Sequence, residues 1–199
     1  MAQQTLFHLH FNTPALETAT ARLNEYGVPL QQRFGTVRGE RVSVGPETQP
    51  PDEFRLKLQV HRIGAVNISL APGQQPHFDH LGVFVADIDD VLTRARSREW
   101  SVRSNERRTF VMTPWGFRVE LHPKSGARGV EFGRSSTPRL EDVILHASNP
   151  QVVREPLQTV FGTIPNLHLE AGEKPWVSSF TVAGERTTET IPVTTLLTE

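Results

Sequence analysis

The chain of 199 residues carries 21 Lys and Arg against 22 Asp and Glu, which gives a formal net charge of −1 at pH 7, and it contains no Cys. This balance argues against a nucleic-acid or membrane partner, and the lack of Cys excludes disulfides, zinc fingers and a thiolate nucleophile. No apolar run is long enough to span a bilayer, and the amino terminus lacks the pattern of a signal peptide, so we expect a cytoplasmic protein.

Residues 1–72 have the pattern of one strand, one helix and three further strands. In the first strand, Thr5–Asn12, an apolar set that includes Phe7 alternates with polar residues. Period-two alternation places His8 and His10 together on the face opposite the apolar set. A helix follows and is expected to end at Gly27. After a loop, three more strands are expected at Arg41–Val44, Phe54–His61 and Ala65–Leu70.

Residues 76–123 restart the same order of elements. His80 begins an apolar strand, and Asp87 is a good N-cap for a helix whose apolar residues follow the i, i+3, i+4, i+7 template. In the last strand of this unit, Glu120 falls on the polar face. The three short strands after the helix are expected around Trp100–Val102, Thr109–Met112 and Phe117–His122.

A third unit is expected at residues 139–199, after a linker at Lys124–Pro138 that is rich in Gly, Ser, Arg and Pro. An ungapped comparison places His8, His80 and Asp142 in equivalent positions, which indicates an internal repeat. In the third unit, Asp142 stands where the first two units have a histidine. Its strands are expected at Leu140–Ala147, Trp176–Val182 and Thr190–Leu197, with a helix kinked or shortened by Pro156.

The strongest candidate for chemistry is the set His8, His80 and Glu120. Each lies on a strand face opposite the apolar residues, so the three side chains are expected to point into one polar cavity. Two neutral imidazoles and one carboxylate leave coordination positions open on a divalent cation, which suits Fe²⁺ and also Mn²⁺, Co²⁺, Ni²⁺ or Zn²⁺. The alternative is that both histidines merely begin strands at a solvent edge and that Glu120 is a surface charge.

Two segments resemble the first and last strands of a module of the vicinal oxygen chelate superfamily, the group of glyoxalases, bleomycin-resistance proteins and extradiol dioxygenases. These segments are His80–Ile88 and Trp115–Leu121. The resemblance implies an α+β fold in which paired βαβββ modules form a cupped mixed sheet, here with a degenerate third module. It also implies metal ligands at His8, His80 and Glu120. A fourth ligand position, a carboxylate in glyoxalase I, falls at Ser69, so the set is similar to that of extradiol dioxygenases.

The remaining candidates are assigned by strand face and by the resemblance. His61 is expected on the cavity face, near where a ring-cleaving dioxygenase keeps its acid/base histidine, and a free imidazole suits proton transfer. Phe110 occupies the region where those dioxygenases place a tyrosine. The residues expected to contact substrate are His10, Lys57, Gln59, Phe110, Arg118 and His122.

The leading hypothesis is an enzyme that uses a divalent metal, with Fe²⁺ favoured, to act on a small oxygen-chelating substrate as a non-haem dioxygenase. A second hypothesis is an isomerase, epimerase or lyase that uses a redox-inert metal. A third, from another class, is a metal-free protein that binds a small molecule, like bleomycin-resistance proteins. The degenerate third unit is a candidate for dimerisation, so a homodimer is also an expectation. Fold alone does not choose among these hypotheses.

Overall fold

The computed structural model describes residues 3–106, 108–126, 129 and 137–198, so most of the predicted linker lies outside the described residues. Two central strands, β1 and β6, lie antiparallel in the middle of a nine-stranded mixed sheet with the order β3-β2-β4-β5-β1-β6-β9-β8-β7. The first half consists of β1 (Thr5–Thr13), α1 (Leu16–Glu25), β2 (Leu30–Val37), β3 (Glu40–Val44), β4 (Arg55–Ile63) and β5 (Val66–Pro72). The second half consists of β6 (His77–Val85), α2 (Ile88–Ser97), β7 (Val102–Ser104), β8 (Thr109–Met112) and β9 (Arg118–Pro123).

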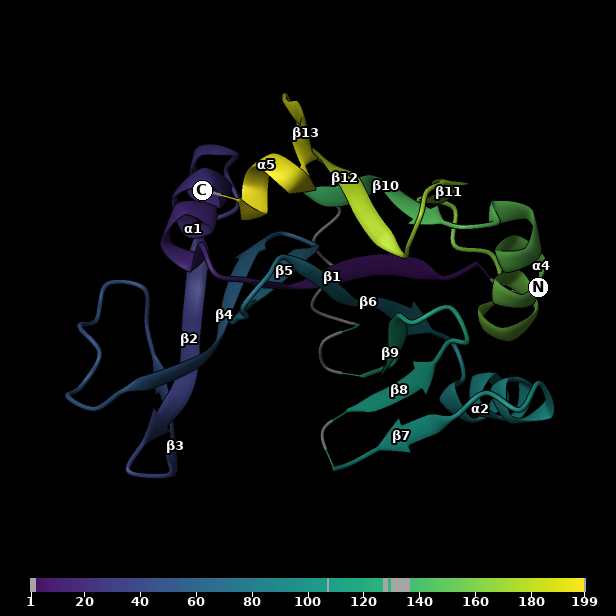
Figure 1. The fold of residues 1–199 in the computed structure, drawn as a ribbon, viewed down its shortest axis with the longest axis horizontal. Coiled ribbons are helices and arrows are strands. Elements are labelled where there is room, and N and C mark those ends of the chain that lie inside the picture. Colours follow the sequence, from purple (N-terminus) through teal and green to yellow (C-terminus); the bar gives the residue numbers. More distant parts are fainter. Residues whose placement is uncertain (1–2, 107, 127–128, 130–136, 199) are drawn as a thin grey trace.

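The two halves are arranged alike around the central pair. The first strand of each half pairs in parallel with the last, β1 with β5 and β6 with β9, and the sheet arches so that β2–β4 and β7–β9 descend on either side (Figure 1). The predicted α+β class is therefore confirmed. The prediction was wrong for β2, where a loop was expected, because the segment holds few apolar residues and one face of it meets solvent. The boundaries at 72, 76 and 123 stay a prediction.

The third part of the chain forms a separate four-stranded sheet with the order β11-β10-β12-β13. It consists of β10 (Arg139–Ala147), α4 (Pro150–Phe161), β11 (Leu167–Ala171), β12 (Trp176–Ala183), β13 (Thr188–Pro192) and α5 (Val193–Leu197). The strand expected at Thr190–Leu197 is wrong in its second half, which turns into α5. Pro156 lies inside α4 and does not end it, since the Asn149 side chain caps the helix and one apolar face is buried.

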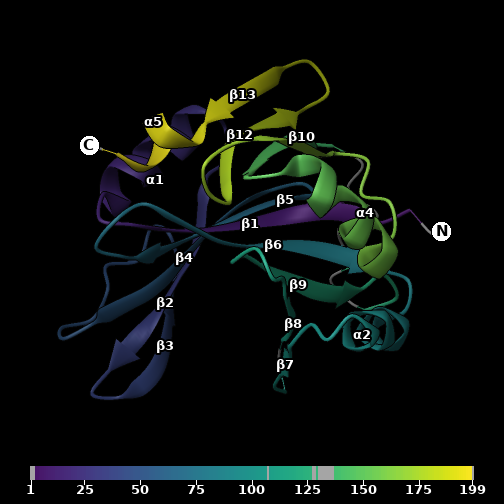
Figure 2. The same ribbon diagram turned by 45° about the vertical axis from the view of Figure 1, so that its right-hand side comes forward.

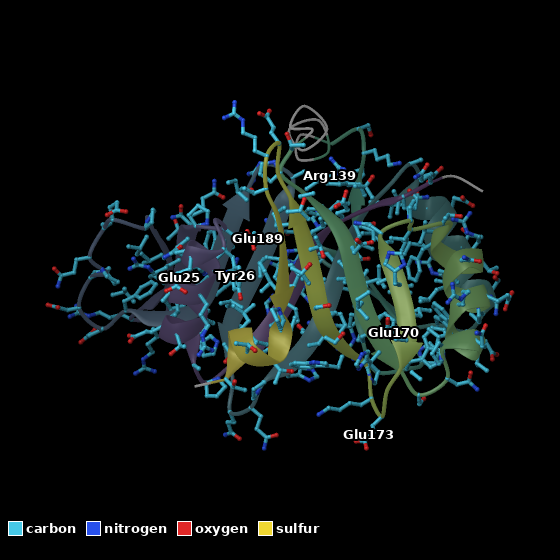
Figure 3. The ribbon with its side chains drawn as sticks, turned by 90° about the horizontal axis from the view of Figure 1, so that it is seen from above. Glu25, Tyr26, Arg139, Glu170, Glu173 and Glu189 are labelled. Carbon is cyan, nitrogen blue, oxygen red and sulfur yellow. The ribbon has the colours of Figure 1, made fainter. Side chains whose placement is uncertain are left out.

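The four-stranded sheet lies over the convex side of the arch, as Figures 1 and 2 show from two directions. One continuous core joins the two sheets, with Leu9 and Phe11 of β1 in the same cluster as Val143 of β10 and Phe180 of β12. The outer face of the upper sheet is polar and carries exposed side chains such as Arg139, Glu170 and Glu189 (Figure 3). The third unit therefore does not close the concave side of the arch.

Single extra residues interrupt the regular alternation of several strands. In β1, Leu6 pairs with Val83 and His8 with Gly82, so Phe7 is an extra residue, and it packs on Phe84 at 4.0 Å between ring centroids. A β-bulge of this kind turns the extra side chain toward the face of its neighbour. The prediction that Phe7 shares the face of Leu9 is therefore wrong, because Phe7 lies on the concave face beside His8.

No helix in the described part of the chain is long and apolar enough to cross a membrane.

Candidate metal centre

Three side chains from three strands meet on the concave face. His8 of β1 and His80 of β6 bring their Nε2 atoms within 3.2 Å of each other, and Glu120 Oε2 of β9 lies 3.2 Å from His80 Nε2 and 3.9 Å from His8 Nε2. All three residues are buried. The structure thus brings together the three atoms that the sequence analysis predicts as metal ligands.

The other ring nitrogen of each histidine is already occupied. His8 Nδ1 lies 3.1 Å from the carbonyl oxygen of Asn67 and 2.9 Å from its Oδ1, and His80 Nδ1 lies 3.2 Å from Asp79 Oδ2. A carbonyl and a carboxylate only accept hydrogen bonds, so both Nδ1 atoms carry a proton and donate it. In the neutral rings, Nε2 is therefore the atom with the free lone pair.

Three lone pairs converge at this point with no donor among them when both rings are neutral. Two acceptor nitrogens at 3.2 Å repel each other, and the carboxylate oxygen adds to the repulsion unless a positive charge lies between them. A divalent cation bound by two imidazoles and one carboxylate removes that repulsion, and the Nδ1 hydrogen bonds hold the rings in the ligating orientation. The donor set fits such a cation.

The surroundings of His8 and Glu120 favour the protonation states that a metal needs. Burial, followed by the charge of His80, lowers the pKa of His8 well below its ordinary value. Burial alone would raise the pKa of Glu120, but the hydrogen bonds that His122 and, when protonated, His80 donate outweigh it and hold this pKa well below the usual range. Glu120 Oε1 is also taken, since His122 Nε2 lies 3.3 Å and Arg108 Nε lies 3.6 Å from it, which leaves Oε2 for a cation.

His10 offers a second way to complete the site. One ring nitrogen from each of His8, His10 and His80 lies within 4.8 Å of the others. The His10 ring, however, stacks on the His80 ring with centroids 4.7 Å apart and planes 18° apart. Burial and the charge of His80 lower the pKa of His10 to about 3, so the ring is neutral. Glu120 Oε2 lies 3.2 Å from His80 Nε2 and 3.9 Å from His8 Nε2, so either Glu120 or His10 can join the two histidines around one cation.

The site opens into a cavity of about 920 Å³ on the concave face. His10, Lys57 and His122 line this cavity as predicted, and Ser69 lies in its wall. Phe110 and Arg118 lie against the site instead. The Phe110 and His80 rings pack edge to face with their centroids 5.1 Å apart. The Arg118 guanidinium lies 4.7 Å from the centroid of the Phe110 ring and forms an ion pair with Asp79.

His61 and Gln59 are not in the cavity. Thr20 of α1 donates a hydrogen bond to Gln59 Oε1 at 2.8 Å, and His61 lies 3.3 Å from the carbonyl oxygen of Val28, so both side chains face α1. The cause is a bulge, because Phe34 pairs with Leu58 and Gly35 with Leu56, which makes Lys57 the extra residue. Lys57 therefore reaches the cavity, whereas Gln59 and His61 lie on the face opposite the predicted one. The prediction that His61 lies on the cavity face as an acid/base residue is wrong for this reason.

Three residues around the site are missing from the sequence analysis: Asn67, Asp79 and Arg108. Asp79 is an extra residue in β6, since His10 pairs with His80 and Phe11 with Phe78. The bulge allows Asp79 to lie beside the ring of its own neighbour His80. A carboxylate next to a candidate ligand was a usable signal for Asp79, whereas the sequence holds no comparable signal for Asn67 or Arg108.

Gly82 has no side chain, which leaves space for the side chain of His8 above the sheet. It lies in one row between His8 of β1 and Glu120 of β9, and a Cβ atom at this position would lie 2.8 Å from the Cβ of His8. We expect Gly82→Ala to displace His8, to destabilise the protein by about 1–3 kcal/mol and to weaken metal binding. Chemical unfolding and metal titration test this. Gly45→Ala, where the nearest atom is at 3.4 Å, is the control, and equal behaviour of the two variants would contradict the prediction.

Asp79 accepts a hydrogen bond from the ring of His80 but is not itself a predicted ligand, so its removal should change metal affinity indirectly. We expect Asp79→Asn to lower metal affinity by about 10-fold to 100-fold, because the carboxylate raises the basicity of His80 and fixes its tautomer. Titration with Mn²⁺ measures the change, with the exposed loop residue Asp52→Asn as the control. An unchanged affinity in Asp79→Asn would show that this contact does not support a metal ligand.

No family model matches the sequence, and no curated protein matches it. Among solved structures, the Mn(II)-bound glyoxalase from Novosphingobium aromaticivorans matches with a TM-score of 0.61 at 10% identity, over 88% of this chain and 64% of that one. The 2,2',3-trihydroxybiphenyl 1,2-dioxygenase from Sphingomonas wittichii strain RW1 matches with a TM-score of 0.62 at 15% identity, over 94% and 75%. A variant of homoprotocatechuate 2,3-dioxygenase from B. fuscum matches with a TM-score of 0.60 at 11% identity, over 89% and 56%.

These matches show that the chain shares the fold of a glyoxalase and of two dioxygenases. The chain spans between 56% and 75% of the length of the three proteins. Since fold does not determine reaction, the activities of these proteins do not transfer with the likeness.

Proposed function

We propose that this chain is a metal-dependent enzyme that binds a divalent cation through His8, His80 and Glu120 and acts on a small oxygen-chelating substrate. The observation that carries the proposal is the meeting of His8 Nε2, His80 Nε2 and Glu120 Oε2 within 3.9 Å, with both Nδ1 atoms already donating. Buried polar atoms with unopposed lone pairs are costly unless a cation satisfies them.

We propose Fe²⁺ as the metal and an extradiol-like dioxygenase as the activity. Three protein ligands on one side of the ion are typical of non-haem Fe²⁺ oxygenases, because they leave adjacent positions open. When bound, such an ion supplies Lewis acidity and a site for electron transfer to oxygen. The two dioxygenases among the structural matches support this choice over a redox-inert ion.

The residues of the chain would position the substrate and the protons around that ion. His10 and His122 line the cavity on either side of the ligands, and both can hydrogen-bond a substrate oxygen. Arg108, which lies 3.6 Å from Glu120 Oε1, can balance negative charge that develops on the substrate. His61 supplies no proton here, since it faces α1.

An isomerase or lyase with a redox-inert metal is the second candidate, and the Mn(II)-bound glyoxalase among the structural matches favours it. Oxygen uptake by protein loaded anaerobically with Fe²⁺, in the presence of catechol and substituted catechols, separates the two. The dioxygenase proposal predicts uptake that depends on both Fe²⁺ and substrate and that is lost in protein loaded with Zn²⁺. Turnover that continues without oxygen, or equally with Zn²⁺, would contradict it.

A further inference from the structure

The charge of the cavity wall is unlike that of the metal site. Four cationic side chains line the cavity, at Arg41, Lys57, Arg62 and Arg108, whereas Glu120 is the only acidic residue among the described residues of the lining. A bound divalent cation would neutralise Glu120. The cavity is then strongly positive, and an anion is the ligand that such a wall attracts.

Two of these cations, on β3 and β4, have no acidic partner among the described residues. Arg41 of β3 and Lys57 of β4 form no ion pair with any residue that the structure describes. Arginines on the outer surface differ, since Arg38 pairs with Glu53 at 2.9 Å and Arg98 pairs with Glu155 at 2.9 Å. The bulge in β4 turns Lys57 toward the cavity, and bulges commonly re-aim a side chain in this way.

An apolar stretch lies between the metal ligands and these cations. Ser69 pairs with both His10 and Val60, so Val60 lies two strands away from His10 in the same row, and Leu58 and Phe34 follow it as a cross-strand pair. Phe34 is 41% exposed and is one of two large exposed hydrophobic residues in the described part of the chain. Its exposure on the cavity wall is explained if an apolar ligand covers it.

The register gives the scale of the ligand. Two strand spacings separate His10 from Val60, which is about 10 Å, and three residues of β4 separate Val60 from Lys57, which is again about 10 Å. The diagonal from the metal ligands to Lys57 is therefore on the order of 15 Å. A ligand that contacts both ends must be elongated, and the cavity of about 920 Å³ is large enough for one.

From these observations, and resting on the proposed function, we propose that the substrate is an elongated amphipathic anion. Its chelating oxygens bind at the metal, its apolar body covers Val60, Leu58 and Phe34, and its anionic group binds Lys57 and Arg41. Each part of the ligand thus meets the part of the wall that matches it in chemistry.

The test uses a matched pair of probes, a catechol with a long alkyl chain that ends in a carboxylate and its methyl ester, together with catechol itself. Binding to the Mn²⁺-loaded protein is measured by titration calorimetry without oxygen. We expect the acid to bind at least about 10-fold more tightly than the ester, because the ester cannot form ion pairs, and we expect this ratio to fall at high salt. Exchange of Lys57→Gln together with Arg41→Gln should remove the ratio.

Two further variants separate the parts of the proposal. Phe34→Ala should weaken the acid and the ester by the same factor, whereas Arg139→Gln on the upper sheet should change neither. Equal affinity of the acid and the ester in a protein that binds Mn²⁺ and catechol would overturn this inference and leave the proposed function standing. A parent protein that binds no Mn²⁺, or that binds catechol equally without it, would overturn both.

Discussion

His8→Ala and Glu120→Gln are each expected to lower the affinity for Fe²⁺ or Mn²⁺ by more than about 100-fold. Loss of a residue that only supports a ligand costs about 10-fold to 100-fold, and loss of the ligand itself exceeds that. Glu120→Gln keeps the size of the side chain and removes only the charge that the cation needs. Calorimetric titration of the metal-free proteins, prepared with a chelator that is then removed, measures both affinities.

The upper sheet offers matched controls for these two variants. His146 of β10 and Glu170 of β11 lie 3.9 Å apart on the exposed face and take no part in the proposed site. His146→Ala and Glu170→Gln should leave metal affinity unchanged. If His8→Ala and Glu120→Gln bind metal as tightly as the parent, the ligand assignment is wrong. If His8→Ala keeps the parent's affinity and His10→Ala loses it, His10 is a ligand in place of His8.

His61 should make the stability of the protein depend on pH. Burial, partly offset by a hydrogen bond to Val28, lowers the pKa of His61 from 6.5 to about 4 in the folded chain. Below pH 6.5 the unfolded chain therefore takes up a proton that the folded chain refuses, and the free energy of unfolding falls as the pH falls toward 4. The full effect of this one side chain is on the order of 3 kcal/mol, and it is absent above pH 6.5.

The effect is measured as a difference between two proteins. Urea unfolding of the metal-free parent and of His61→Gln is followed from pH 7.5 to pH 4, and the contributions of the other histidines cancel in the difference. We expect the variant to lose less stability than the parent on acidification, so that the difference grows in its favour by up to about 3 kcal/mol. Two curves that stay parallel over this range would show that His61 does not titrate differently in the folded chain.

The sequence was informative about the fold wherever the pattern of a strand and its following helix was repeated. The equivalent positions of His8 and His80 placed two imidazoles on the paired first strands, and β1 and β6 do lie side by side. The apolar sets at Leu9, Leu81 and Val83 are in the core. Repetition of this kind constrains the architecture because each unit must bury the same apolar face.

Alternation alone could not locate the bulges, and these decide much of the cavity. The extra residues Phe7, Lys57 and Asp79 each lie on the same face as the residue that follows, and the bulge at Lys57 puts Gln59 and His61 on the face opposite the predicted one. A shift of one residue moves every following side chain to the other face. For this reason the prediction failed for Gln59 and His61 while it placed Lys57 in the cavity.

Partners from other strands were also beyond the reach of the sequence pattern. Asn67 meets His8 only because β5 pairs in parallel with β1 at this register, and Arg108 meets Glu120 because it directly precedes β8, which pairs with β9. Such contacts are nonlocal and depend on the tertiary arrangement, so the periodicity of the sequence does not predict them. The roles of His8, His80 and Glu120 as ligands stay a prediction that their proximity supports.

Anomalous X-ray diffraction from crystals grown with Mn²⁺ or Fe²⁺ tests the metal centre most directly. We expect one strong anomalous peak per chain, at about 2 Å from each of His8 Nε2, His80 Nε2 and Glu120 Oε2. A peak bound elsewhere, or a well-ordered site in which these three atoms surround no metal at saturating concentration, would contradict it.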